Sequence, residues 1–179
     1  MSESDWLECT DPGPMLEFVQ GKATQRKLRL FAVACCRRVW PRMTDALSRH
    51  AVELAERSAD EPVSDEELDA ASGAAEGAYE DSLTDDAGEA VGDDDPRPAA
   101  AAAASYASSP GMLGAEHFSV VLEGACAAAP GRTGQEKAVQ AAMLRDLFGN
   151  PFRPQTPLDA GRLAWTDGTL TKLAKAAYE

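Results

Sequence analysis

The sequence predicts an all-α fold, an irregular bundle of about six to eight helices with an acidic Ala/Gly-rich insert. Two segments, residues 25–40 and 135–148, carry apolar side chains at helical spacing and have capping residues beside them. The chain has no isoleucine and few valines, and these residues are enriched in strands. Much of its apolar content is alanine, so we expect closely packed helices with little bulky side-chain surface to bury.

Residues 25–40 form the strongest predicted helix. Thr24 is the expected N-cap, and Pro41 stops the helix because proline cannot continue it. The main apolar stripe consists of Leu28, Phe31, Ala32, Cys35 and Val39. Most of the other positions between residues 28 and 36 are also apolar, so we expect this helix to be central and buried on most sides.

Two further helices flank the central one. Asp-Pro-Gly-Pro at residues 11–14 predicts a turn, and a short helix over residues 15–20 follows it. A longer helix is expected over residues 45–59, packed against the central helix. Its predicted apolar stripe consists of Leu47, His50, Ala51 and Leu54. We therefore expect His50 to be a partly buried structural residue.

The next helix is predicted from a capping box. Ser64 and Glu67 have the spacing of a capping box, in which each side chain accepts a hydrogen bond from the backbone N–H of the other residue. The opposite side of this helix is densely acidic, and its apolar face is expected to carry Leu68, Ser72, Ala75, Tyr79 and Leu83. Residues 85–98 are rich in turn-forming residues and are expected to be flexible. The alanines of residues 99–104 favour a helix but define no apolar face.

The C-terminal third contains four predicted helices. They cover residues 115–128, 135–148, 158–164 and 169–178, and Gly149 is expected to follow the end of the second. The first helix has a stripe of Phe118, Val121, Leu122 and Ala125. The second has a stripe of Val139, Ala142, Met143 and Leu147, with Leu144 and Phe148 beside it.

The net charge of −13 is concentrated in the middle of the chain. Residues 61–95 hold 14 of the 30 acidic side chains and none of the 17 Lys and Arg residues. We therefore expect a single helical domain over residues 1–179, in which residues 1–60 and 110–179 enclose an acidic, partly flexible insert at residues 61–110.

This charge excludes several classes of partner. An acidic middle segment repels nucleic acid and anionic membrane surfaces, so another protein with a basic surface is the expected partner. The longest apolar runs, residues 30–36 and 99–104, are too short to span a bilayer. Residues 1–11 contain no apolar signal segment, so we expect a cytoplasmic protein with reduced thiols.

The sequence lacks the motifs of common catalytic, nucleotide-binding and metal-binding sites. No cofactor or metal is therefore expected. The residues that could act in a thiol or metal site are Cys9, Cys35, Cys36, Cys126, His50 and His117. Adjacent Cys35 and Cys36 point about 100° apart on a helix and chelate one ion poorly.

A basic cluster occupies the two ends of the central helix. It consists of Lys22, Arg26, Lys27, Arg29, Arg37, Arg38 and Arg42. One hypothesis is that these cations pair with the acidic residues 61–95 and that a partner displaces this segment. The alternative is a solvated acidic segment beside ordinary helix-end charges.

Three sequence segments together resemble a family that occurs in many paralogous copies in planctomycete bacteria. The segments are residues 5–12 (DWLECTDP) with 15–18 (MLEF), residues 26–40 (RKLRLFAVACCRRVW) and residues 144–154 (LRDLFGNPFRP). The resemblance implies no known activity, cofactor or catalytic residue. It implies an Ala-rich middle of variable length, similar to residues 64–108. Many members continue with more helix past the position of Tyr178, so this chain resembles a short or truncated member.

Most of the large aromatic residues sit at the ends of the predicted elements. They are Trp6, Phe18, Trp40, Phe148, Phe152 and Trp165. At such positions aromatic rings can hold neighbouring helices together. We therefore interpret residues 148–154 as a structural clasp, with an active-site loop as the alternative.

These observations favour a non-enzymatic protein-binding module, regulatory or adaptor in kind. Its candidate partner-binding residues are Asp65, Glu66, Asp69, Glu76, Glu80, Asp81, Asp85 and Asp86. The alternative is a small enzyme that uses Cys35 or Cys36 as a nucleophile beside His50, and a more distant one is a nucleic-acid-associated protein.

Overall fold

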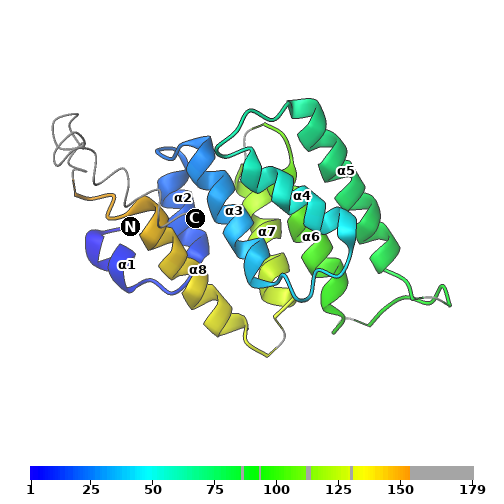
Figure 1. Ribbon diagram of the computed structural model, residues 1–179. Coiled ribbons are helices and arrows are strands. Elements are labelled where there is room, and N and C mark those ends of the chain that lie inside the picture. Colours follow the sequence, from blue (N-terminus) through cyan, green and yellow to red (C-terminus); the bar gives the residue numbers. More distant parts are fainter. Residues whose placement is uncertain (86, 93, 112–113, 130, 154–179) are drawn as a thin grey trace, which may run out of the picture.

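The computed structural model describes residues 1–85, 87–92, 94–111, 114–129 and 131–153, and these residues form α-helices with no strand (Figure 1). The helices of the described residues are α1 (Glu3–Glu8), α2 (Pro12–Gln20), α3 (Gln25–Arg38), α4 (Ala46–Arg57), α5 (Asp65–Ser82), α6 (Pro96–Ser108), α7 (Ala115–Ala127) and α8 (Thr133–Phe148). The predicted all-α bundle is confirmed. The helices predicted over residues 158–164 and 169–178, together with Trp165, lie outside the described residues.

The bundle has two ends joined by α3 and α7. Figure 1 shows α1, α2 and α8 on one side and α4, α5 and α6 on the other, with α3 and α7 between them. Helix α3 contacts α4, α6, α7 and α8. Its predicted central position is therefore confirmed. It packs against α4, as predicted, and also against α8.

Helix α3 follows its sequence pattern closely. The Thr24 side chain accepts a hydrogen bond from the backbone N–H of Lys27, as expected of an N-cap. All five residues of the predicted stripe are buried. The helix ends at Arg38, two residues earlier than predicted. The residue before a proline avoids helical dihedral angles, so Trp40 cannot remain helical in front of Pro41.

The buried face of α4 differs from the predicted stripe. Leu47 is 49% exposed and His50 is also exposed. The residues that the helix buries are small apart from Leu54: Ser48, Ala51, Val52, Leu54 and Ala55. Because α5 and α6 lie against α4, side chains that fit between close helices occupy this face.

The segment 61–110 supplies two helices to the core. The capping box at Ser64 and Glu67 is confirmed. Helix α6, whose alanines define no face in sequence, contacts α3, α4, α5 and α7. The alanines that α6 buries are Ala100, Ala101, Ala103, Ala104 and Ala107. The acidic segment therefore belongs to the bundle, because alanines on every side let α6 pack closely between its neighbours.

Helix α8 buries a line of residues beside the predicted stripe, and this line includes Leu144 and Phe148. Ala142 of that stripe is exposed and Val139 is only half-buried. The buried residues are Glu136, Gln140, Ala141, Leu144 and Phe148. Two of them are polar, so an apolar search could not select this face. Gly149 ends the helix with a φ of 66°, which favours glycine.

The two ends of the described chain are held together. Helix α1 was not predicted, and its capping box joins Ser2 to Asp5. Trp6 is fully buried, and its indole N–H donates to the carbonyl of Gly149 at 3.1 Å. The Arg145 guanidinium donates to the carbonyls of Trp6 and Cys9 at 3.2 and 2.8 Å.

Side chains beyond α8 complete this junction. Asn150 and Arg153 both donate to the Glu3 carboxylate, at 2.6 and 2.7 Å. The ring of Phe152 stacks on Phe18 with 5.0 Å between centroids. These contacts agree with a structural clasp over the described residues 148–153. Helix α2 includes the residues predicted to form a turn, because Asp11 caps it and Pro12 occupies its first position.

Candidate functional site

The predicted partner-binding residues lie on α5 and in the turn after it. Asp86 lies outside the described residues. The other seven candidates are exposed: Asp65, Glu66, Asp69, Glu76, Glu80, Asp81 and Asp85. The structure thus brings six of them onto one helix, while Asp85 belongs to the turn.

Four of these carboxylates share one face of α5, which we call the acidic face: Glu66, Asp69, Glu76 and Glu80. Their separations of three, ten and fourteen residues bring them to one side of a helix, over a length of about 21 Å. The buried face of α5 carries Leu68, Ala71, Ala75 and Ala78 and lies opposite. The two faces cannot both pack on the bundle, so the acidic face points away from it.

The local sequence explains why α5 is helical despite its charge. The Ser64 side chain accepts from the backbone N–H of Glu67, and the Glu67 carboxylate accepts from the backbone N–H of Ser64, both at 3.2 Å. Acidic residues in the first turn also suit the positive end of the helix dipole. Glu80 and Asp81 lie in the last turn, where the dipole disfavours them, and that turn has no basic residue.

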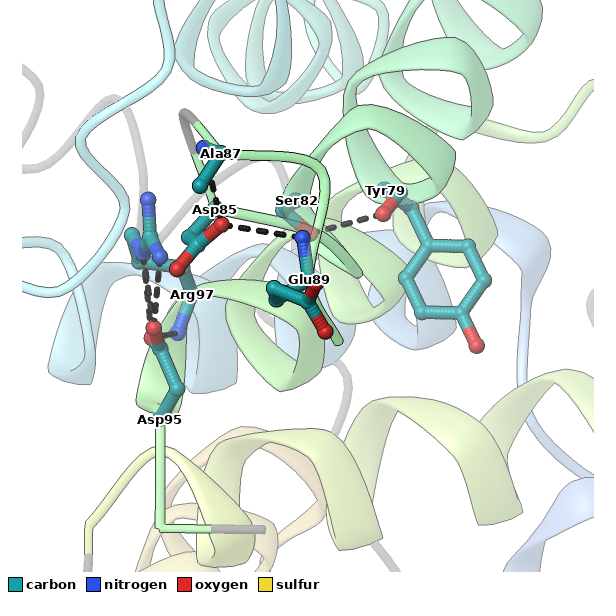
Figure 2. Close-up of polar contacts among 7 residues, drawn as sticks. All are labelled: Tyr79, Ser82, Asp85, Ala87, Glu89, Asp95 and Arg97. Atoms are coloured by element: carbon teal, nitrogen blue, oxygen red, sulfur yellow. Dashed lines mark hydrogen bonds and ion pairs between the residues drawn. The ribbon is translucent and has the colours of Figure 1, made fainter. Parts of the chain in front are cut away.

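Two carboxylates after α5, those of Asp85 and Asp95, have structural roles. Figure 2 shows the Asp85 carboxylate accepting from the backbone N–H groups of Ala87 and Glu89, at 2.9 and 3.0 Å. Asp95 accepts from the backbone N–H of Arg97 at 2.9 Å and pairs with its guanidinium at 2.7 Å. Hydrogen bonds from the Arg97 side chain lower the pKa of Asp95. Asp85 is therefore partly engaged in the turn and is a weaker candidate than the acidic face.

Basic residues of α3 pair with carboxylates outside residues 61–95. Arg26 pairs with Asp60, and Arg37 pairs with Glu56. These contacts do not follow the hypothesis that residues 61–95 mask the basic cluster. Arg29 is the residue of the cluster that comes closest to this hypothesis. Burial lowers its pKa, and the charge of Asp65, a residue of the acidic segment, raises it to a lesser extent. Its guanidinium donates to backbone carbonyls at the end of α6, at 3.2 and 2.8 Å.

A half-buried ion pair links α3 to α8. Arg38 donates to both carboxylate oxygens of Glu136, at 2.7 and 2.9 Å. Glu136 is 5% exposed, so the carboxylate of this bidentate pair is largely shielded from water. Sequence analysis missed it because 98 residues separate the partners and no local pattern relates them.

The cysteines of α3 lie in the core. Cys35 and Cys36 have no exposed surface, and the Cys36 thiol donates to the carbonyl of Ala103 at 3.5 Å. Burial raises the pKa of Cys35 well above its usual value and raises that of Cys36 to about 12. A nucleophilic cysteine needs its thiolate, so this environment opposes the proposed Cys–His50 site.

The described residues contain no group of three or more His, Cys, Asp or Glu side chains placed to hold a metal ion. None of the helices described here is long and apolar enough to cross a membrane. Comparisons of the chain with protein-family models, curated proteins and solved structures give no match. Membership of the planctomycete family therefore stays a prediction.

Proposed function

We propose that this chain is a non-enzymatic protein-binding module, regulatory or adaptor in kind, whose acidic face binds a basic surface of another protein. The observation that carries the proposal is the position of the acidic face, exposed along α5 and opposite its alanine-rich packing face. A rigid helix holds these carboxylates at fixed spacing. A partner with cations at a matching spacing could contact several of them together.

The charge distribution of α5 supports this proposal energetically. Glu76 and Glu80 are four residues apart, and like charges at that spacing destabilise a helix by about 0.2–0.5 kcal/mol. The unfavourable position of Glu80 in the last turn adds to this effect. A basic partner would relieve both repulsions. Long-range attraction would also speed its association with the module.

The alternatives have less support. A cysteine-based enzyme requires a thiolate where burial favours the thiol, and it requires His50, which is exposed on α4. Nucleic-acid binding is opposed by the same carboxylates that favour a basic protein.

The experiment compares two variants that lose the same charge. The test variant carries Asp69→Asn, Glu76→Gln and Glu80→Gln. The control variant carries Glu8→Gln, Glu53→Gln and Asp146→Asn, three exposed residues outside α5. Proteins captured from cells by the wild-type chain are identified by mass spectrometry, and their binding to each variant is measured by calorimetry at two salt concentrations.

We expect the control to bind like wild type and the test variant to bind more weakly. We also expect wild-type binding to weaken as salt increases. Equal binding by the two variants would place the interaction elsewhere on the bundle. A partner whose affinity does not depend on salt would also contradict an electrostatic contact.

A further inference from the structure

A cavity of about 460 Å³ lies between α2, α7 and α8, on a different part of the bundle from the acidic face. Its volume falls within the range of about 300–1,000 Å³ that is usual for small-molecule sites. The apolar residues Leu16, Phe118 and Leu122 line it and are buried. The lining is apolar in this part and suits an aromatic or aliphatic group.

One polar side chain in this lining is buried without a strong partner. Gln140 lines the cavity and has no exposed surface. Within the described part of the chain, its amide contacts only the thiol of Cys126, with 3.8 Å from Nε2 and 3.9 Å from Oε1 to the sulfur. Thiols are weak donors and acceptors. A buried amide whose hydrogen bonds are made only to a thiol is less well satisfied than one paired with oxygen or nitrogen.

The charged residues of the lining favour a cation. Lys137 pairs with Asp11 at 3.1 Å, so these two charges compensate each other. A hydrogen bond from the Gly13 backbone N–H lowers the pKa of Asp11. The lining also contains Glu17 and Glu123, both exposed, and it contains no other Lys, Arg or His. The formal charge of the described lining is therefore negative.

We propose that this cavity binds a small organic ammonium ion. The apolar body of the ligand packs against Leu16, Phe118 and Leu122, and its ammonium group lies near Glu17 and Glu123. A carboxylate or phosphate ligand would meet repulsion from the same two residues. A neutral apolar ligand would fill the cavity without using them. This proposal does not depend on the partner-binding role of α5.

The test uses three probes of similar shape and different charge. Naphthylethylamine carries an ammonium group, naphthylethanol is neutral, and naphthylpropionate carries a carboxylate. Each is titrated into the full chain near neutral pH by calorimetry. We expect saturable binding of the amine, about three- to tenfold tighter than the alcohol, with the carboxylate weakest.

Two variants locate the bound amine. Ala127→Trp places a large ring at an exposed position of the cavity lining, and Ala142→Trp places the same ring at an exposed position of α8 outside it. We expect the first to abolish amine binding and the second to preserve it. Circular dichroism checks that both variants are folded.

A double variant tests the charge argument. Glu17→Gln with Glu123→Gln should reduce amine affinity to that of the alcohol and leave alcohol binding unchanged. The proposal is overturned if no probe binds saturably, if the folded Ala127→Trp variant binds the amine like wild type, or if the double variant keeps the preference for the amine.

Discussion

Gly124 lies where the backbone of α6 comes close to α7, and its replacement by alanine should destabilise the protein. A Cβ atom added at this position would lie 2.6 Å from the carbonyl oxygen of Ala99 and 3.1 Å from the Cβ of Ala103. The first of these distances is far below van der Waals contact. Because the nearer atom belongs to the backbone, a rotamer change cannot remove the clash, and the two helices must move apart.

A matched substitution isolates the steric effect. Gly73 lies in the middle of α5 on an exposed position, where an added Cβ meets no atom within 4 Å. Alanine is favoured over glycine in a helix by about 1 kcal/mol, so Gly73→Ala should stabilise the protein by up to that amount. The same preference acts at Gly124, but overpacking opposes it by about 1–3 kcal/mol.

The preference for alanine is common to both sites, so the difference between the variants measures the clash. We expect Gly124→Ala to be less stable than Gly73→Ala by about 2–3 kcal/mol, the upper part of the overpacking range. For a chain of this length, that difference corresponds to roughly 4–12 °C in melting temperature.

Urea denaturation followed by far-ultraviolet circular dichroism gives the free energies of unfolding of both variants and of wild type. If Gly124→Ala is as stable as Gly73→Ala, the packing argument for α6 and α7 is wrong.

Three further predictions concern the clasp, the thiols and acid stability. Arg145→Met removes two hydrogen bonds to the chain around α1, so we expect the free energy of unfolding to fall by about 1–3 kcal/mol. We also expect faster amide hydrogen exchange in α1, measured by mass spectrometry, and unchanged exchange would contradict the clasp. Iodoacetamide at neutral pH should modify partly exposed Cys9 before buried Cys35 and Cys36, and rapid native-state labelling of Cys36 would instead revive the cysteine-enzyme alternative. The pKa of Asp11 is lowered in the folded state, chiefly by the backbone N–H that it caps, so its stabilisation is present above its pKa in the unfolded chain and is lost as pH falls below about 4. Asp11→Asn should make the free energy of unfolding less dependent on pH in that acidic range, and an unchanged dependence would refute this assignment.

The sequence predicted helices best where local chemistry defines them. The N-cap at Thr24 and the capping box at Ser64 depend on residues within one helical turn, and both are present in the structure. Helix α3 was also predicted with its buried stripe because it is apolar on most sides. Helix α1 was missed because its first turn is polar and only Trp6 among its residues is buried.

The acidic face could be predicted from the sequence, whereas the cavity could not. Helical spacing alone places Glu66, Asp69, Glu76 and Glu80 on one face of α5. The cavity could not be predicted, because its lining comes from three helices that are distant in sequence and includes the buried polar residue Gln140.

By itself, the sequence determined the all-α class, the starts of α3, α4, α5 and α7 to within one residue, and the concentration of acidic charge in the middle of the chain. These properties depend on composition and on neighbours within a few residues. Only the tertiary structure decided which faces of α4, α6 and α8 are buried. Small side chains such as those of Ala100 and Ser48 fit on several faces, and an ion pair such as Arg38–Glu136 can make a polar face a buried one. Which of these side chains is buried therefore depends on the neighbouring helices, which supply the close packing and the distant charge partners.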